Sequence, residues 1–319
     1  MKENSDYSFR SSAWDDKAGV RSNPETYDLQ LSDDYILDGT GLSWHLPSYS
    51  GILEHEDLSH LSGKEKEFVK GTQLLEFVTK QTIFEIDCVN YVTSRLAHNK
   101  YKFDLPEFLK LDALKIYTDE GYHAYYTQKI ANQIRRYYRI GEDDISPFVE
   151  SYYSKIESIV TKFGEENKDL CMLAFVIAGE NQIVFDISAE MSQIVFKPIW
   201  ILFRDHMKDE VFHAKYFTMI FQDIWPQLSP DEKEIMGLCF CDSMEILGLP
   251  RTDIYHFSLA KLGIGKQQIL KCINDIYNTI EWRTTRIADR MKPTINLLTS
   301  NDVFDIETVR KAFEGKKYI

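Results

Sequence analysis

From about residue 62 onward, apolar residues recur at intervals of three and four positions, which is the spacing of an amphipathic helix. No stretch alternates apolar and polar residues in the way that a half-buried strand requires. No low-complexity tract interrupts the helical pattern. The sequence therefore predicts an all-α protein.

Capping residues divide this pattern into separate helices. Ser62 with Glu65 and Ser229 with Glu232 are capping boxes, in which both side chains bind free N–H groups of the first helical turn. Prolines at helix starts and glycines at helix ends mark most other limits. We expect helices over residues 63–98, 104–141, 146–164, 169–191, 198–224, 229–248 and 266–298, the last bent at Pro293, and a short tail from residue 301.

The first 61 residues lack this periodicity. They contain turn formers and scattered aromatic residues, so we expect an arm and loops that drape over a single helical domain of residues 62–319. Several acids and histidines in the arm are expected to be solvated loop positions: Asp33, Asp34, His45, His55 and His60.

Two glutamates interrupt otherwise apolar helices. Glu85 lies well inside the first long helix, and Glu180 lies in the most apolar helix of the chain. Buried acids are rare unless they are paired or bound to a metal. A pair with Arg or Tyr is the alternative for each position, and Asp87 and Glu190 compete for the same roles from other helix faces.

A third pattern combines glutamate with histidine. His206, Glu210 and His213 are four and then three residues apart, so they share one stripe of a helix. Glu120 and His123 repeat the ExxH spacing upstream. An Asp, at 119 and at 209, precedes each motif glutamate. Two such helices suggest two metal ions.

Together these residues form the ligand set of a dinuclear bundle, in which two helices supply one Glu each and two supply Glu-x-x-His. Glu120 follows Glu85 by 35 residues and Glu210 follows Glu180 by 30, and each separation suits an antiparallel helical hairpin. Four carboxylates would balance two divalent ions. Imidazole and carboxylate favour iron, then manganese, whereas zinc sites more often use fewer carboxylates. The expected ligands are Glu85, Glu120, His123, Glu180, His206, Glu210 and His213.

The aspartates point away from the ligand stripe. We expect Asp119 and Asp209 to accept the second N–H of a metal-bound histidine and so to orient its ring, with a surface helix charge as the alternative. His206 taken alone would more often be a hydrogen-bonded core or surface histidine. Its position one turn before Glu210 makes it a third histidine ligand.

Composition narrows the class of partner. The net charge of −13 in 319 residues works against binding to nucleic acid. The most apolar window, residues 194–203, is short and contains Lys197 and Pro198, so we expect no membrane span and a soluble cytoplasmic protein. The five cysteines form no CxxC motif and are expected to be reduced core residues, with a zinc site at Cys239 and Cys241 as the less favoured alternative.

Between about residues 71 and 221 the chain resembles the arylamine N-oxygenase family, ferritin-like non-haem diiron enzymes that include the p-aminobenzoate N-oxygenase AurF. The resemblance rests on Glu85, the DExxH at residues 119–123, Glu180, and above all the HxxxExxH at residues 206–213. It implies a ferritin-like bundle with extra C-terminal helices and two iron ions. One ion would be held by Glu85, Glu120 and His123, and the other by Glu180, His206, Glu210 and His213.

The resemblance also implies a reaction. It implies O2 activation and oxidation of an amine nitrogen to hydroxylamine, nitroso or nitro, in natural-product biosynthesis. The amine is aryl or derived from an amino acid, and either free or carrier-bound. Electrons come from an external reductase or ferredoxin, since no nucleotide-binding GxGxxG motif follows a strand. A homodimer is possible, and manganese is a possible substitute metal.

Substrate contacts are less defined by the sequence. Residues one turn from the ligands could line the pocket, and acidic or basic residues nearby could anchor a charged substrate. The candidate wall residues are Phe77, Phe84, Val89, Val184 and Phe185, and the candidate anchors are Asp186, Arg204, Arg283 and Arg286.

Three other functions stay open. A radical generator would carry Tyr four residues beyond the first motif histidine, where this chain has Thr127, with Tyr125 and Tyr126 nearby. A ferritin-like hydroxylase or desaturase would use the same metal ligands. A non-catalytic iron-binding bundle is less favoured, because the chain adds an arm and C-terminal helices to the bundle.

Overall fold

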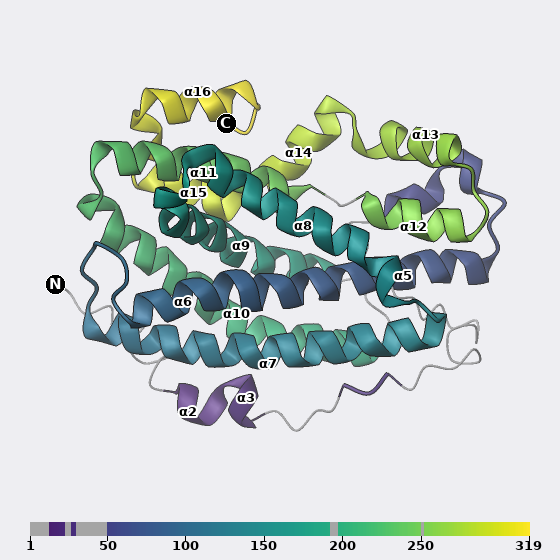
Figure 1. The fold of residues 1–319 in the computed structure, drawn as a ribbon, viewed down its shortest axis with the longest axis horizontal. Coiled ribbons are helices and arrows are strands. Elements are labelled where there is room, and N and C mark those ends of the chain that lie inside the picture. Colours follow the sequence, from purple (N-terminus) through teal and green to yellow (C-terminus); the bar gives the residue numbers. More distant parts are fainter. Residues whose placement is uncertain (1–12, 23–26, 30–49, 192–196, 250–251) are drawn as a thin grey trace.

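The computed structural model describes residues 13–22, 27–29, 50–191, 197–249 and 252–319 (Figure 1). Within these residues all regular structure is helical, which confirms the predicted all-α class. The helices of the central bundle are α5 (Gly63–Ile83), η3 (Phe84–Val89), α6 (Asn90–Ala97), α7 (Glu107–Tyr138), α8 (Glu142–Phe163), α9 (Lys168–Met191) and α10 (Lys197–Ile224).

Further helices flank the bundle on both sides in the sequence. Before it come α2 (Trp14–Lys17), α3 (Gly19–Ser22), η1 (Ser50–Glu54) and η2 (Glu56–Leu58), and within it lies η4 (Glu165–Asn167). After it come η5 (Trp225–Gln227), α11 (Pro230–Gly248), α12 (Asp253–Lys261), α13 (Lys266–Tyr277), α14 (Ile280–Arg290), α15 (Lys292–Ser300), η6 (Val303–Asp305) and α16 (Glu307–Gly315).

Both predicted capping boxes are present. The Ser62 side chain accepts the N–H of Glu65, and the Glu65 carboxylate accepts the backbone N–H of Ser62, which starts α5. Ser229 and Glu232 make the same exchange at the start of α11. Satisfying these free N–H groups locally fixes where two long helices begin.

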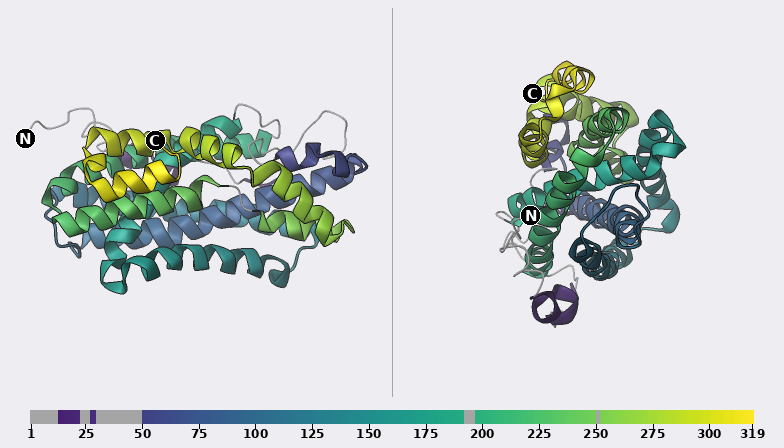
Figure 2. Two further views of the ribbon diagram at one scale, coloured as in Figure 1. Left: turned by 90° about the horizontal axis from the view of Figure 1, so that it is seen from above. Right: turned by 90° about the vertical axis from the view of Figure 1, so that its left-hand side faces the viewer.

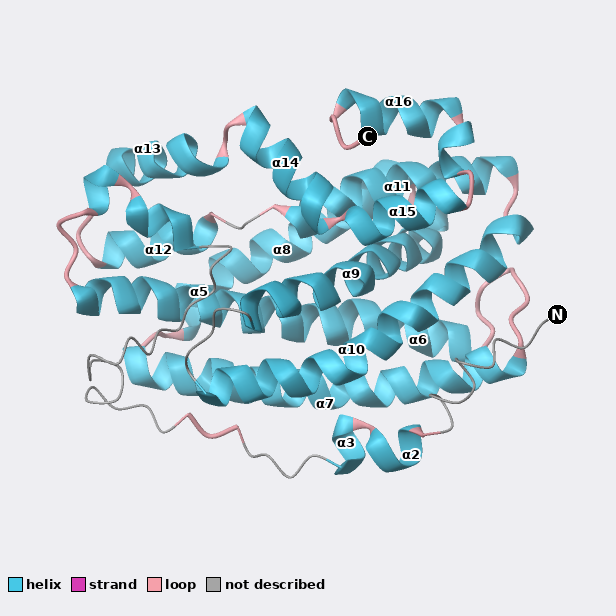
Figure 3. Cartoon of the chain, turned by 180° about the vertical axis from the view of Figure 1, so that it is seen from behind, coloured by secondary structure: helices cyan, strands magenta, loops and turns pink. Residues whose placement is uncertain are grey.

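Two helical pairs form the bundle. The segment α5–η3–α6 packs along α7, and α9 packs along α10 (Figures 1 and 3). The C-terminal helices cover the α9 side through α11, α14 and α15, whereas α2 and α3 lie on the opposite side, against α7 and α10 (Figure 2). The ends of the described chain therefore cover opposite sides of the same bundle.

A polar band separates two apolar cores inside the bundle. Along α7, buried apolar residues from Leu109 to Ile116 belong to one core, and those from Tyr126 to Ile134 belong to the other. Of the buried residues between them, those at positions 119, 120 and 123 are acidic or histidine, and only Ala124 is apolar. The same change from apolar to polar and back occurs along α10. The bundle thus encloses its charged side chains at mid-length.

The first long helix differs from the expectation of one continuous α-helix over residues 63–98. A six-residue π-helix, η3, separates α5 from α6 and contains Glu85. A π-helical turn rotates the residues that follow relative to those before it, and such turns occur frequently at functional sites. The residue types in this segment do not predict a π-helix, because the helical spacing of apolar residues continues through it.

Two helix limits also differ. The helix α8 begins at Glu142 instead of Ser146, because Gly141 and Asp144 form a cap upstream of Pro147. The helix α7 ends at Tyr138, and Arg139 adopts a left-handed conformation with φ of 55°. Gly141 was expected to end α7, but the turn is made two residues earlier.

The C-terminal pattern is three helices instead of one bent helix. Thr279 accepts the N–H of Trp282 and caps a new helix, α14, so the chain breaks after α13. Pro293 lies in the first turn of α15 instead of bending a continuous helix. The expectation of one helix over residues 266–298 is therefore wrong, and α12 was not predicted.

The structure agrees with the expectation for the cysteines. All five are buried and free of disulfide bonds, in accordance with the prediction of reduced core residues. Across the described ranges, no helix combines the length and apolar character that crossing a membrane requires.

Candidate metal centre

Four segments of the bundle each direct a glutamate into the polar band. Glu85 comes from η3, Glu120 from α7, Glu180 from α9 and Glu210 from α10. Three histidines join them, one from α7 and two from α10. None of the seven side chains is more than 1% exposed: Glu85, Glu120, His123, Glu180, His206, Glu210 and His213. Water therefore cannot solvate their charges.

Six of these side chains form two overlapping groups. In one group, donor atoms of Glu85, His123, His206 and Glu210 all lie within 4.8 Å of one another. In the other, donor atoms of Glu120, His123, Glu210 and His213 do so. His123 and Glu210 belong to both groups, so the two candidate ion positions lie side by side.

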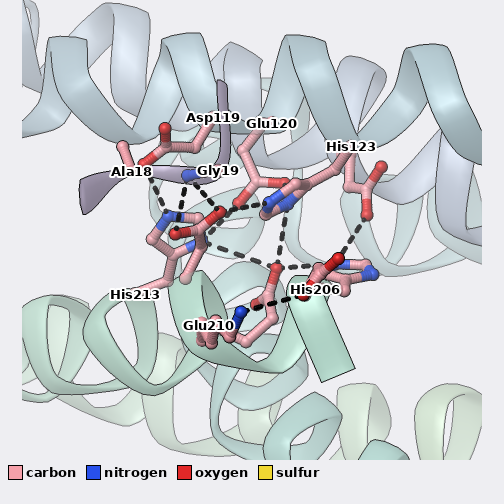
Figure 4. A network of polar contacts seen from close by, with 12 residues as sticks. Ala18, Gly19, Asp119, Glu120, His123, His206, Glu210 and His213 are labelled. Atoms are coloured by element: carbon pink, nitrogen blue, oxygen red, sulfur yellow. Dashed lines mark hydrogen bonds and ion pairs between the residues drawn. The ribbon is translucent and has the colours of Figure 1, made fainter. Parts of the chain in front are cut away.

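Glu210 lies at the centre of the cluster (Figure 4). Its Oε1 is 2.8 Å from Nε2 of His206, 3.2 Å from Nδ1 of His123 and 3.6 Å from Nδ1 of His213. Glu120 lies between two histidines of the second group, with Oε1 2.8 Å from Nδ1 of His213 and Oε2 3.5 Å from Nδ1 of His123, which also belongs to the first group. These two carboxylates occupy positions from which each could bridge two ions.

Glu85 and Glu180 lie at opposite ends of the cluster. Glu85 Oε1 is 3.2 Å from Nε2 of His206, and Glu180 Oε2 is 3.8 Å from Nδ1 of His213. His206 was expected beside Glu180, and the structure corrects this expectation. With a helical rise of about 1.5 Å per residue, His206 lies about 6 Å before Glu210 and His213 about 4.5 Å after it, so they face different groups.

The donor atoms of the cluster are arranged to bind a metal ion and not to form hydrogen bonds with one another. Within the part of the chain that the structure describes, nine buried donor atoms have no hydrogen-bond partner: both oxygens of Glu85 and of Glu120, one oxygen each of Glu180 and Glu210, and Nδ1 of all three histidines. The Nδ1 of His213 and Oε1 of Glu120 are only 2.8 Å apart, but the two groups are not oriented for a hydrogen bond between these atoms. Buried polar atoms are nearly always satisfied, so their convergence fits a site that binds a cation.

Burial and charge shift the pKa values of the cluster. Burial raises the pKa of Glu85 to about 7 and that of Glu180 well above its usual value. Burial alone would lower the pKa of His213, but the adjacent carboxylates of Glu120 and Glu210 outweigh it and raise this pKa well above the usual value. Protons and metal ions therefore compete for the same donor atoms.

The two aspartates contact histidines, but across the bundle. Asp119 Oδ2 is 3.4 Å from Nε2 of His213, and Asp209 Oδ2 is 3.2 Å from Nε2 of His123. Each aspartate thus reaches the histidine of the other motif helix, which ties α7 to α10 (Figure 4). The alternative of a surface charge does not hold, because Asp119 is 1% and Asp209 is 9% exposed.

Three residues near the centre were not predicted. The indole Nε1 of Trp14 donates to both oxygens of Asp119, and the backbone N–H of Gly19 contacts the Asp209 carboxylate. Both lie in the expected arm, where the only signal was a Trp in a polar stretch. The Tyr126 ring lies 5.5 Å from the His123 ring, and its buried hydroxyl has no hydrogen-bond partner among the described residues.

The other acids and histidines lie elsewhere or outside the described part. Asp87 is exposed and accepts a hydrogen bond from Tyr153. His55 contacts Asp275 and Cys272 instead of solvent alone, and His60 is exposed. Asp33, Asp34 and His45, and the side chains of Asp186 and Glu190, lie outside the described residues.

The expected substrate contacts are divided between different places. Phe77 and Phe84 line a small cavity of about 30 Å³ together with Gly179 and Ile183, next to Glu85 and Glu180 in sequence. Val89 is core, Val184 is packed against core, and Phe185 faces a separate surface cavity. The candidate anchors have other partners: Arg204 pairs with Asp205, Arg283 with Glu245, and Arg286 lies over Trp282 and donates to the Gly248 carbonyl.

Thr127 is also accounted for. Its hydroxyl donates to the His123 carbonyl and shares a hydrogen bond with Thr82, so the position that carries tyrosine in radical generators holds the helix backbone here.

Four buried glutamates on four bundle segments, with ExxH on two of them, define the ferritin-like dinuclear carboxylate proteins. Within this class, the chain belongs to the AurF family: the family model described as p-aminobenzoate N-oxygenase AurF matches residues 55–288. All seven candidate ligands lie within the match. The chain is accordingly an enzyme of the diiron N-oxygenase type. Comparison with curated proteins gives no match.

Proposed function

We propose that the seven buried side chains hold two iron ions and that the protein uses O2 to oxidise the nitrogen of an amine. The observation that carries this proposal is the convergence of carboxylate and imidazole atoms that are fully buried and lack hydrogen-bond partners. Glu85, His123 and His206 would serve one ion, and Glu180 and His213 the other. Glu120 and Glu210 would lie between them.

Iron, when bound, supplies the reduction of O2 and the oxidation of the amine. The protein's own part is to hold and shield the reacting groups. The apolar cores on either side of the polar band exclude water, which strengthens the interactions inside the centre. Asp119 and Asp209 fix the ring orientation of His213 and His123. Manganese is proposed as a substitute because the same oxygen and imidazole donors suit it.

The reaction needs an external source of electrons. In forming a hydroxylamine, one oxygen atom of O2 is inserted into an N–H bond and the other leaves as water. This balance requires two electrons and two protons beyond the amine. We propose that a reductase or ferredoxin supplies the electrons. The iron ions must return to the same oxidation state after each turnover, so they cannot be the net source of electrons.

We propose an arylamine or an amino-acid-derived amine as substrate, in natural-product biosynthesis in the cytoplasm. The aromatic walls Phe77 and Phe84 beside the ligand segments support an aromatic amine. The cavity there is only about 30 Å³, which is the space of a single water. An aromatic substrate would therefore have to displace the Phe84 ring, which rests on Gly179.

We further propose that two copies of the chain associate through α7. The outer face of this helix exposes several large apolar side chains, more than the scattered exposure that is normal for a monomer. They are Leu111, Leu114, Tyr117 and Tyr125. Gly121 lies on the same helix, and a Cβ built there meets no atom within 4 Å, so a second helix could approach closely.

The test is anaerobic loading with Fe(II), reduction, and exposure to O2 with a panel of aryl, amino-acid and carrier-bound amines, followed by mass spectrometry. An N-oxygenase converts the amine to a product with the mass of the hydroxylamine, nitroso or nitro compound while reductant is consumed in step. Oxygen added to carbon, or loss of two hydrogens, would favour a hydroxylase or desaturase. Consumption of Fe(II) and O2 with every amine unchanged would favour an iron-binding bundle.

A further inference from the structure

A short N-terminal segment, residues 13–22 with helices α2 and α3, contacts both carboxylates that hold the motif histidines. Trp14 Nε1 donates to Asp119 at 3.0 Å and 2.8 Å from its two oxygens. The Gly19 N–H donates to Asp209 at 3.4 Å and 3.3 Å. Figure 4 shows Gly19 directly against the network of carboxylates and histidines. This segment lies outside residues 55–288, the part that the family shares.

Each contact continues inward to a candidate ligand. From Trp14 the hydrogen bonds run through Asp119 to His213, and from Gly19 they run through Asp209 to His123. The two paths end in different histidines of the dinuclear cluster. One segment therefore contacts both halves of the centre.

The segment fits this place closely. A Cβ built on Gly19 would lie 2.6 Å from Asp209 Oδ2, so only glycine brings the backbone N–H to the carboxylate without displacing it. Ala18, between the two helices, is 4% exposed. Trp14 offers one N–H and no acceptor, so its polar atom can only donate to Asp119.

We propose that residues 13–22 are an integral part of the metal centre and that Trp14 and Gly19 are positioning residues for its histidines. The inference rests on the proposed ligand roles of His123 and His213. A carboxylate that receives a second hydrogen bond from outside has less freedom to rotate, and it holds the imidazole N–H in one direction. The free imidazole nitrogen then points steadily into the cluster.

The simplest competing explanation is that the segment only covers the surface of α7 and α10. In that case its removal would change stability but not the binding or spectrum of the ions. The probe is Co(II) alone, added to metal-free full-length protein, because its visible absorption depends on the direction and identity of the ligands. The variants are Trp14→Phe and Gly19→Ala, which act on separate helices and separate aspartates.

Lys17→Ala is the matched control, because Lys17 is exposed in the same segment and contacts neither aspartate in any described hydrogen bond. We expect Trp14→Phe and Gly19→Ala each to weaken Co(II) binding by about 10-fold, as changes behind a metal ligand typically do, and to alter the absorption bands. Lys17→Ala should match the wild type. Thermal unfolding of each metal-free variant checks that folding is retained.

The outcomes separate the two proposals. Wild-type affinity and absorption in both variants, in a protein that binds two Co(II) ions, would overturn the positioning role and leave the proposed function intact. A wild-type protein that binds no pair of Co(II) ions would overturn the ligand assignment on which both depend. Weaker binding by Lys17→Ala equal to that of Trp14→Phe would assign the effect to the segment's stability and would also overturn the positioning role.

Discussion

At the scale of single residues, the cluster trades stability for metal binding. Four carboxylates are buried away from water. A buried negative charge lowers the stability of the fold unless a cation balances it. Glu180 has the longest of these contacts, since its Oε2 is 3.8 Å from Nδ1 of His213. A residue kept in such a place destabilises the metal-free fold and becomes favourable only with an ion beside it.

Glu180→Gln tests this trade directly. The variant keeps the shape but removes the charge, so we expect metal-free protein at about pH 8 to gain about 1 kcal/mol or more in free energy of unfolding. Iron content should fall by one ion per chain, because the ligand beside His213 is lost. Thermal unfolding and metal analysis measure the two effects. Two ions retained together with lower stability would contradict the assignment.

His206→Ala tests the corrected grouping. His206 faces Glu85, so we expect the variant to lose the ion of the Glu85 group and retain the one beside His213. Iron analysis and the absorption of the Co(II)-loaded protein report which ion remains. His98→Ala is the control, because His98 is an exposed histidine outside the cluster. Iron content equal to that of the control would remove His206 from the ligands.

The pKa shifts predict how the stability of metal-free protein depends on pH. Burial raises the pKa of Glu85 from 4.5 to about 7. Between these values the folded chain holds a proton that the unfolded chain has released, so stability falls as pH rises through this window. The raised pKa of His213 acts in the same direction, since its contribution is complete below 6.5 and is lost as pH rises through the folded value.

We therefore expect chelator-treated protein to lose stability between about pH 5 and pH 7, measured by thermal unfolding at each pH. Glu85→Gln should make this decline shallower, because it removes one of the protons that folding retains. A variant whose decline is as steep as that of the wild type would show that Glu85 does not titrate in this window.

At the scale of elements, the π-helix η3 and the helix α9 depend on each other. Phe84 is packed so closely on Gly179 that a Cβ at this position would lie 2.2 Å from the end of the ring. Both residues directly precede a candidate ligand, Glu85 and Glu180. The contact thus sets the distance between two ligand-bearing segments, which also enclose the small cavity at Phe77.

Gly179→Ala should separate these segments. We expect a loss of about 1–3 kcal/mol in stability from overpacking, together with lower iron content. Gly121→Ala is the matched control, because it is the same substitution within a helix but meets no atom within 4 Å. The control should gain about 0.5–1 kcal/mol from the higher helix propensity of alanine. Equal changes in the two variants, by chemical unfolding, would refute the close contact.

The sequence predicts those elements whose signals are local. Capping boxes at Ser62 and Ser229 fix helix starts, and the ExxH spacing places Glu120 with His123 on one helix face. The π-helix leaves no local signal, because it depends on how Glu85 meets the other helices. The pairing of Asp119 with His213 likewise depends on the packing of α7 against α10. The role of Trp14 depends on a contact across 105 residues.

At the scale of the whole molecule, two apolar cores flank one charged band, and α7 presents both an inner and an outer face to partners. Its inner face carries Asp119, Glu120 and His123, whereas its outer face exposes Leu111 and Tyr125. Metal binding and the proposed self-association therefore involve one helix. The fold as a whole places the candidate ligands at mid-length of the bundle, between the two apolar cores.

Leu111→Glu tests the self-association. The charge should not disturb folding, since Leu111 is 59% exposed, but it should prevent two apolar α7 faces from meeting. We expect a dimer in the wild type and a monomer in the variant by sedimentation velocity. Ser154→Glu, at an exposed position of α8, is the control. A monomeric wild type would exclude the proposed dimer.

The central property proposed for the cluster is that it holds a pair of ions. Anaerobic titration of metal-free protein with Fe(II), followed by absorption and metal analysis, measures this directly. We predict saturation at two iron ions per chain in the wild type and at no more than one in Glu210→Ala, which removes the carboxylate shared by both groups. Saturation at one ion or fewer in the wild type would contradict the dinuclear centre.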